Sequence, residues 1–252
     1  MKNHLQTLST DKRIKIDYDS LDADFFQKLL DFYFDPKRNF INSYVMKNIK
    51  LIIQFLIWAT KMGYNKNLDF KEWKLETGNK RESSKNKAIA LTNEEFFRFW
   101  KMKFRNESMQ RTRDFLILAC STGLRFSDIQ ALKKSDVDFV QGIITCTTQK
   151  TGDEAVIPLN IFSQTILEKY RLLPNYDSKG VEMAFPTISN QKTNKALKQL
   201  AKKAKINQMV TIVHYQRNKR IDEVKPKYDL ISTDIGRKTY VTLLVWLGIE
   251  SE

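Results

Sequence analysis

The chain has 252 residues, of which 43 are lysine or arginine and 29 are aspartate or glutamate, so its formal net charge is +14. This excess favours a polyanionic partner, most commonly nucleic acid, although charge alone leaves RNA-binding, ribosomal and membrane-surface proteins open. Two cysteines and two histidines argue against a disulfide framework and a structural zinc site. No segment approaches the roughly 20 apolar residues of a membrane span, and residues 1–20 lack a signal-peptide core, so a cytoplasmic location is expected.

Two amphipathic helices are predicted in the N-terminal segment. Residues 22–34 place their apolar side chains along one face, with Asp22 as the N-cap. Residues 43–63 form a longer amphipathic pattern that ends at Gly63, a residue suited to the position after a helix. Two packed helices of this kind predict a small all-α domain over residues 1–77.

The composition then changes. Residues 78–88, GNKRESSKNKA, are polar and lysine-rich, so residues 78–90 are interpreted as an interdomain linker, with an ordinary solvated loop as the alternative. A second domain is predicted over residues 91–252. Its expected elements, in order, are a helix behind the capping box of Thr92 and Glu95, a helix over 111–121, strands at 143–149 and 154–158, a helix at 160–171, a basic helix at 189–205, a hairpin of 210–216 and 220–225, and a last helix from 233 or 234 to 247. The predicted fold class is mainly α with small β-hairpins.

Three cationic residues lie at the ends of these expected elements. Arg125 starts a short helix after a Thr-Gly turn, Lys150 lies at the tip of the first hairpin, and Arg237 lies near the start of the last helix. Taken singly, each has an ordinary structural interpretation. Arg125 would be a surface or capping residue, Lys150 would aid solubility, and Arg237 would pair with an acidic neighbour.

Taken together and in this order, the three segments resemble motifs of the tyrosine recombinase (phage integrase) family. STGLRFSDIQAL is similar to the motif of the first arginine, TQKTGDEAVIPL to the lysine hairpin, and ISTDIGRKTYVTLLVWLG to the box of the second arginine. The resemblance covers nearly the whole chain. It implies a helical core-binding (SAM-like) domain at residues 1–77, followed by an α+β catalytic domain at residues 91–252.

The resemblance also implies a reaction. Members of the family break and rejoin DNA through a 3′-phosphotyrosine link, without a metal or cofactor. By the family pattern Arg125 and Arg237 hold the non-bridging phosphate oxygens, and Lys150 protonates the leaving 5′-oxygen. Asp128 either orients the Arg125 guanidinium or caps the helix that follows it.

Two departures from the family pattern stand out. Asp234 occupies the place of a histidine, where it is interpreted as an N-cap, an introduced inactivating change or a tolerated variant. The chain also stops at LGIESE, before the family's nucleophilic tyrosine, and Tyr240 matches an aromatic packing position instead. The expectation is therefore a recombinase truncated before its nucleophile, which binds DNA without cutting it.

The expected partner is double-stranded DNA at attachment or recombination sites of a mobile element. The exposed lysines predicted to contact its phosphates are Lys47, Lys50, Lys192, Lys195 and Lys198. Family members tetramerise on DNA, whereas this chain alone is expected to be a monomer. The first alternative is a non-catalytic relative that competes for attachment sites. An RNA-binding or ribosome-associated protein is disfavoured by the lack of RNA-module motifs, and a type IB topoisomerase by the helical N-terminal domain.

Overall fold

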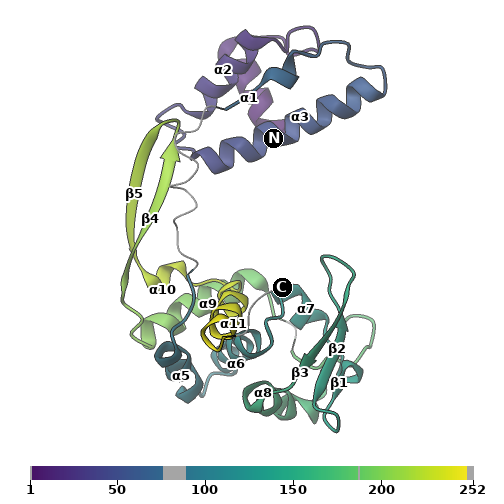
Figure 1. The fold of residues 1–252 in the computed structure, drawn as a ribbon, viewed down its shortest axis with the longest axis vertical. Coiled ribbons are helices and arrows are strands. Elements are labelled where there is room, and N and C mark those ends of the chain that lie inside the picture. Colours follow the sequence, from purple (N-terminus) through teal and green to yellow (C-terminus); the bar gives the residue numbers. More distant parts are fainter. Residues whose placement is uncertain (1, 76–88, 187, 249–252) are drawn as a thin grey trace. The chain divides into compact units, whose positions relative to one another are not determined.

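The computed structural model describes residues 2–75, 89–186 and 188–248, and these residues are mostly helical (Figure 1). They form two compact units. The first unit contains Met1–Lys87 together with Thr211–Glu223, and the second contains Ala88–Val210 together with Val224–Glu252. Residues 78–88 of the expected linker lie outside the described residues, so that boundary stays a prediction. Residues 211–223 belong to the first unit although they lie far along the chain from residues 1–87, so the first unit is not continuous in sequence.

Unit 1 is built from α1 (Lys2–Lys12), α2 (Ala23–Tyr33), α3 (Asn42–Lys61) and the short 3₁₀ helix η1 (Asp69–Glu72). The start of α2 forms as predicted, since Asp22 Oδ1 accepts a hydrogen bond of 2.7 Å from the Phe25 N–H. Gly63 follows α3 with a φ of +79°, in the left-handed region that favours glycine. The apolar faces of the helices meet in one core, whose central side chains are Leu8, Leu29, Tyr33, Val45, Leu56 and Phe70.

Helix α1 was not predicted from the sequence. Its residues, KNHLQTLSTDK, are mostly polar and show no apolar stripe. The helix is nevertheless anchored, because the Leu8 side chain is fully buried in the core that α2 and α3 form. Packing against these two helices, and not its own pattern, therefore stabilises α1.

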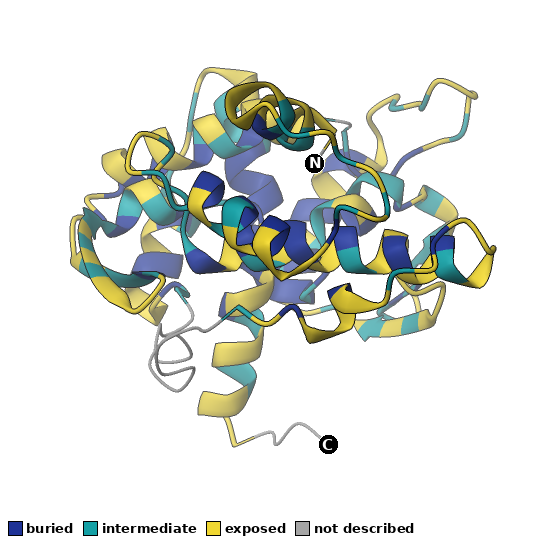
Figure 2. Ribbon diagram, turned by 90° about the horizontal axis from the view of Figure 1, so that it is seen from above, coloured by how far each residue is buried: buried dark blue, intermediate teal, exposed yellow. Residues whose placement is uncertain are grey.

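Unit 2 is built around helix α6 (Glu107–Thr122), in which every residue from 112 to 122 is buried. Along most helices of the chain, buried and exposed residues alternate, so one face of each helix is buried (Figure 2). The other helices of this unit are α5 (Asn93–Lys101), α7 (Phe126–Ala131), η2 (Lys134–Asp136), α8 (Ile161–Arg171), α9 (Asn190–Lys203), α10 (Lys227–Leu230) and α11 (Ile235–Trp246). The predicted capping box of α5 is confirmed, with the Glu95 N–H donating to Thr92 Oγ1 and the Thr92 N–H donating to Glu95 Oε2.

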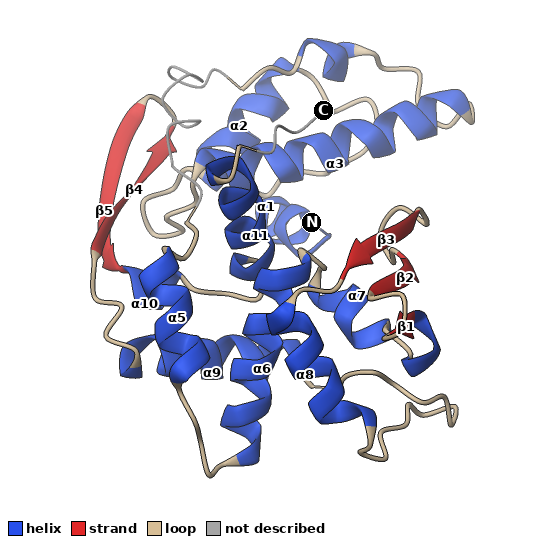
Figure 3. Ribbon diagram, turned by 60° about the horizontal axis from the view of Figure 1, so that its bottom comes forward, coloured by secondary structure: helices blue, strands red, loops and turns tan. Residues whose placement is uncertain are grey.

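Two small antiparallel sheets accompany the helices (Figure 3). Strands β1 (Val137–Asp138), β2 (Ile143–Thr147) and β3 (Glu154–Pro158) are paired in the order β1-β2-β3, with Ile144 opposite Ile157. Strands β4 (Met209–Gln216) and β5 (Lys219–Pro226) form a separate hairpin. The mainly helical fold class with small β-hairpins is confirmed. No helix among the described residues has the length and apolar character needed to cross a membrane.

Helices α6 and α11 cross at very short range. A Cβ added to Gly236 of α11 would lie 2.4 Å from the Cβ of Ala119 in α6. Leu91 strengthens the same region, because its N–H donates to the Thr239 hydroxyl over 2.9 Å. The absence of a side chain at Gly236 therefore sets the position of the first turn of α11.

Unit 2 also contains ion pairs of buried carboxylates that were not predicted from the sequence. Asp114 is fully buried and accepts hydrogen bonds from Tyr170 Oη at 2.8 Å and from Lys169 Nζ at 2.5 Å. Glu95 pairs with Lys227 Nζ at 2.6 Å, again with both side chains buried. A buried charge is tolerated when it is paired and hydrogen-bonded, and both carboxylates meet this condition.

Gly236→Ala should destabilise unit 2. The added methyl group overpacks the contact with Ala119, which costs roughly 1–3 kcal/mol, whereas the better helix propensity of alanine returns about 1 kcal/mol. The expected net loss is up to about 2 kcal/mol, measured as faster hydrogen exchange of the α6 amides. Lys238→Ala, at an exposed position of the same helix, is the control and should leave exchange unchanged. Equal exchange in both variants would contradict the close crossing.

Tyr33→Phe should make unit 1 more stable at neutral pH. The Tyr33 hydroxyl is buried and has no hydrogen-bond partner among the described residues, so its removal should gain about 1 kcal/mol. Burial raises the Tyr33 pKa from 10.0 to about 12. The pKa of Tyr33 is therefore higher in the folded state than in the unfolded state. Titration of Tyr33 does not reduce the free energy of unfolding below pH 10, but this free energy falls as the pH rises from 10 to about 12, because the unfolded chain loses the Tyr33 proton first.

The measurement is urea unfolding followed by tryptophan fluorescence at pH 7 and between pH 10 and 12. Tyr33→Phe should lose less stability over the alkaline interval than the wild type does. Tyr64→Phe serves as the control because Tyr64 is exposed. An equal alkaline loss in Tyr33→Phe and the wild type would show that Tyr33 is not the titrating group.

Candidate functional site

The turn between α6 and α7 places Arg125. Gly123 ends α6 with a φ of +69°, and Arg125 then occupies the position before the first residue of α7. A Cβ on Gly123 would lie 2.5 Å from the ring of Tyr240. Gly123 is therefore required both for its left-handed backbone and for its contact with Tyr240. This contact agrees with the expected packing role of Tyr240.

Arg237 reaches the same turn from the other end of the unit's sequence. It lies in the first turn of α11, and its Nη1 donates to the Gly123 carbonyl oxygen over 3.3 Å. Gly123 precedes Arg125 by two residues. The structure thus brings the second arginine motif to the backbone of the first, across more than a hundred residues of chain.

Asp128 connects this turn to the lysine hairpin. Its side chain is buried, its Oδ2 accepts from the Arg125 N–H at 3.3 Å, and its Oδ1 accepts from the Gln149 N–H at 2.9 Å. Both of these donors are backbone groups. Among the described residues, the Asp128 carboxylate forms no hydrogen bond with the Arg125 guanidinium. The alternative prediction, that Asp128 caps α7, is confirmed by its bond with the Arg125 N–H. The bond to Gln149 was not foreseen, because sequence spacing does not reveal which loop lies beside α7.

Lys150 follows Gln149 in the turn between β2 and β3 and is exposed. The turn is closed by two hydrogen bonds, from the Thr148 N–H to the Asp153 carbonyl at 2.8 Å and from the Gly152 N–H to the Thr148 carbonyl at 2.9 Å. Asp128 thus holds the residue directly before Lys150. The three cations predicted from separate motifs are joined through Gly123 and Asp128.

The charges of this region are available to an anion. Within the described residues, neither the Arg125 guanidinium nor the Lys150 ammonium group forms an ion pair or a side-chain hydrogen bond. The Arg237 guanidinium donates to a neutral carbonyl group and is otherwise exposed. Because guanidinium groups stay charged and bind phosphate oxygens through paired N–H donors, this arrangement suits a phosphate. No cluster of three histidine, cysteine, aspartate or glutamate residues suited to a metal occurs in the described part of the chain.

Asp234 directly precedes α11 but does not cap it as predicted. Its backbone is in the right-handed helical region, and its exposed carboxylate accepts no capping hydrogen bond. Its neighbour Thr233 is held instead by α9, since the Thr233 N–H donates to Asn194 Oδ1 over 2.8 Å. The interpretation of Asp234 as a side-chain N-cap is therefore wrong, because α9 provides the contact that holds this end of the helix.

The five lysines predicted to contact DNA are all exposed, but they belong to different units. Lys192, Lys195 and Lys198 lie on α9, whose opposite face packs into the core of unit 2. Lys47 and Lys50 lie on α3 in unit 1.

Comparison with known proteins identifies the relatives of this fold. The profile of the Phage integrase family matches residues 90–219. A tyrosine recombinase XerC from Roseiflexus sp. (strain RS-1) is 35% identical over 83 residues, which span 32% of this chain and only 26% of that relative. Among solved structures, the Tn1549 transposon integrase in complex with a circular intermediate DNA is similar with a TM-score of 0.67 and 12% identity, over 99% of this chain and 80% of that one. A lambda integrase dimer bound to a core site gives a TM-score of 0.60 and 14% identity, over 97% of this chain and 79% of that one. At these identities the structural likeness shows the fold.

Asp128→Ala should release the lysine hairpin turn. The substitution leaves the Gln149 N–H without its acceptor, a loss of about 1–3 kcal/mol that should speed hydrogen exchange of the Gln149 amide at least fivefold. Asp136→Ala is the matched control, since the Asp136 carboxylate accepts from the Lys133 N–H at 2.9 Å and from the Ser135 hydroxyl at 3.4 Å, both within its own segment of chain. Unchanged exchange of the Gln149 amide in Asp128→Ala would show that the bridge does not hold the turn.

Proposed function

Because the chain belongs to the Phage integrase family, we propose that it acts on double-stranded DNA in site-specific recombination, in which strands are broken and rejoined through a 3′-phosphotyrosine link. One observation carries this proposal. Arg237 donates to the carbonyl of Gly123, two residues before Arg125, and Asp128 joins Arg125 to the turn of Lys150. We infer that these three cations, which have no carboxylate partner among the described residues, act together on one backbone phosphate.

The proposed roles follow from the charge that develops during phosphoryl transfer. The pentavalent transition state carries negative charge on its non-bridging oxygens, which Arg125 and Arg237 would stabilise. Lys150, exposed at the tip of its turn, would give a proton to the leaving 5′-oxygen. Asp128 would act as a positioning residue through backbone amides, and no residue of this set requires a metal.

Binding to DNA would draw on exposed lysines in both units. Lys192, Lys195 and Lys198 are three residues apart on α9, so they share one exposed side of that helix. Lys47 and Lys50 supply the corresponding contacts of unit 1. The logarithm of the affinity should fall by roughly 0.9 for each neutralised phosphate per tenfold rise in salt.

Unit 2 has four tyrosines among its described residues, Tyr170, Tyr176, Tyr228 and Tyr240, and we propose that none of them is the attacking nucleophile. The Tyr170 hydroxyl donates to buried Asp114, and the Tyr176 hydroxyl donates to Glu182. The ring of Tyr240 packs on Gly123, and the ring of Tyr228 packs against the core of unit 2. We therefore propose that these residues hold the scissile phosphate but form no covalent link with it, and that a monomer of this chain binds DNA without cutting it.

A second candidate function is a non-catalytic DNA-binding relative that competes for attachment sites. The position of Asp234 favours it, because an exposed carboxylate at the start of α11 stands where the family has a histidine and would repel a phosphate. The two candidates differ in one respect. Asp234→His, together with a family-like C-terminal segment, should restore strand cleavage in a recombinase and should fail to do so in a long-standing binding protein.

A double-mutant cycle tests whether Arg125 and Arg237 share one phosphate. Arg125→Ala and Arg237→Ala should each weaken binding of a DNA duplex about tenfold, by loss of a charge-assisted hydrogen bond, and the double variant should lose much less than the product of the two effects. Affinity is measured by fluorescence anisotropy at fixed salt. Arg111→Ala, which removes an arginine paired with Glu107 on α6, is the control and should combine additively with either variant.

Additive losses for Arg125→Ala and Arg237→Ala would contradict a shared phosphate. The proposed inability to cut is tested separately, by intact-mass analysis after incubation with a suicide duplex that traps covalent intermediates. No protein–DNA adduct is expected. A stable adduct would show that the chain contains a competent nucleophile.

A further inference from the structure

The turn of the β4–β5 hairpin has an unusual backbone. Arg217 and Asn218 alone connect the two strands, and Arg217 has a φ of +51°, in the left-handed region. Two-residue hairpin turns need such a conformation, which glycine, asparagine or aspartate usually provides. For an arginine it costs about 1–2 kcal/mol. A favourable contact elsewhere must therefore offset this cost.

Asn42 provides that contact. It is the first residue of α3, and its side chain is buried. Its Oδ1 accepts from the Arg217 N–H at 2.7 Å, and its Nδ2 donates to the Arg217 carbonyl at 2.8 Å. Both backbone groups of the strained residue are thus satisfied by a single amide side chain, as a neighbouring strand would satisfy them.

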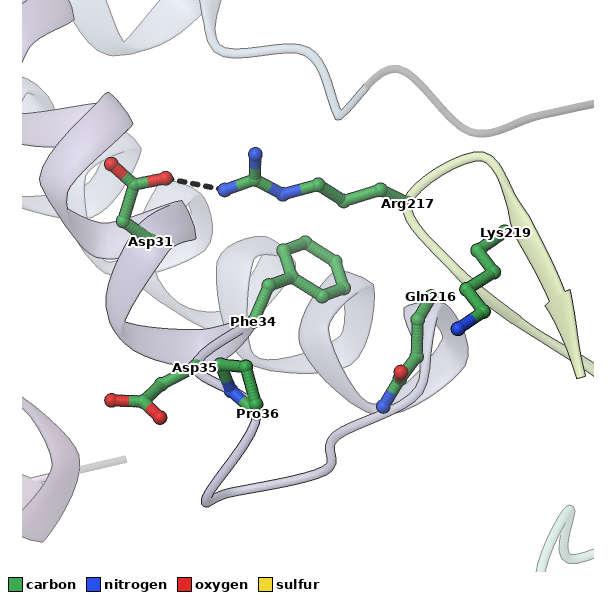
Figure 4. Close-up of a pocket in the computed structure, with 7 residues that line it drawn as sticks. All are labelled: Asp31, Phe34, Asp35, Pro36, Gln216, Arg217 and Lys219. Carbon is green, nitrogen blue, oxygen red and sulfur yellow. Dashed lines mark hydrogen bonds and ion pairs between the residues drawn. The ribbon is translucent and has the colours of Figure 1, made fainter.

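The side chains at the turn are engaged as well (Figure 4). The Arg217 guanidinium pairs with Asp31 of α2 and lies 5.4 Å from the ring centroid of Phe34. Gln216 Nε2 donates to Asn39 Oδ1 at 2.8 Å and to the Phe40 carbonyl at 3.2 Å. Asn39 itself has a φ of +51°, so the loop before α3 is also shaped at this contact.

We propose that α2 and the start of α3 form a docking socket for the tip of this hairpin. The socket consists of Asp31, Phe34, Asn39 and Asn42, and the tip consists of Gln216 and Arg217. The occupant is the hairpin of the same chain, since residues 211–223 belong to the same compact unit as the socket. The socket recognises a tip with a glutamine followed by an arginine in a left-handed turn, through one carboxylate, one aromatic ring and two amides.

Docking of the tip in the socket is a non-covalent contact within unit 1. The contact has two components of different salt dependence. The Asp31 and Arg217 side chains are each 50% exposed, so salt screens their attraction. The hydrogen bonds of buried Asn42 are not screened in this way. Docking should therefore weaken with rising salt without being abolished.

Hydrogen exchange of the full-length chain tests the socket. Asn42→Ala and Asp31→Ala should each speed exchange of the amides in residues 211–223, with roughly a tenfold effect for Asn42→Ala and a smaller one for Asp31→Ala. Asp24→Ala is the control, because Asp24 is a carboxylate of the same helix that pairs with Lys28 instead. The paired reversal Asp31→Arg with Arg217→Asp should recover most of the protection lost in Asp31→Arg alone. Exchange in the socket variants equal to the control would overturn the proposal.

Cross-linking tests whether the tip docks within one chain. Asp35 and Lys219 line the same pocket (Figure 4), so Asp35→Cys with Lys219→Cys should be joined by a short bis-maleimide. Cys120 and Cys146 are buried, and the wild-type chain is the control for their reaction. A cross-linked monomer supports the proposal. A covalent dimer would show that the tip docks on a second copy, and no cross-link would show that the socket is empty, so either result overturns it. None of these measurements contains DNA, so their outcome is independent of the proposed recombinase function.

Discussion

The close crossing of α6 and α11 is the constraint on which the candidate site depends. Gly236 has no side chain, and this lets α11 approach the backbone of α6 at Ala119. The next residue, Arg237, is thereby carried to the carbonyl of Gly123 at the end of α6. Since α6 is the most deeply buried helix of unit 2, the arginine of α11 is positioned by a rigid core and not by a loop. This is the support that a phosphate site needs, because small displacements of a charged group weaken its action strongly.

Unit 2 treats its acidic and its basic groups differently. Asp114, Glu95 and Asp128 are buried, and each is satisfied by cations or by N–H donors. Arg125 and Lys150 have no carboxylate partner among the described residues. Burying the carboxylates in completed networks removes their charge from the surface around the cations. An anion can therefore approach Arg125 and Lys150 without first breaking an ion pair, and the exposed carboxylate of Asp234 at the start of α11 is the opposing charge.

Unit 1 shows how a distant segment can complete a small helical fold. The hairpin tip contributes a strained arginine, and the socket offsets that strain through the amide of Asn42 and the carboxylate of Asp31. Strain of this kind persists only where surrounding contacts over-determine the conformation.

The sequence by itself determined the local features of this protein. Periodicity and capping predicted α2, α3 and α5, and the three motifs named Arg125, Lys150 and Arg237, because these signals are carried by neighbouring residues. Tertiary structure alone decided the rest. Helix α1 has no apolar stripe, and it is stabilised because Leu8 packs into the core of unit 1. The hydrogen bonds of Asp128 with Gln149, of Arg237 with Gly123 and of Asn42 with Arg217 join residues far apart in the chain. No local pattern encodes such contacts, since their geometry depends on how packed helices cross and on which backbone groups that crossing leaves to be satisfied.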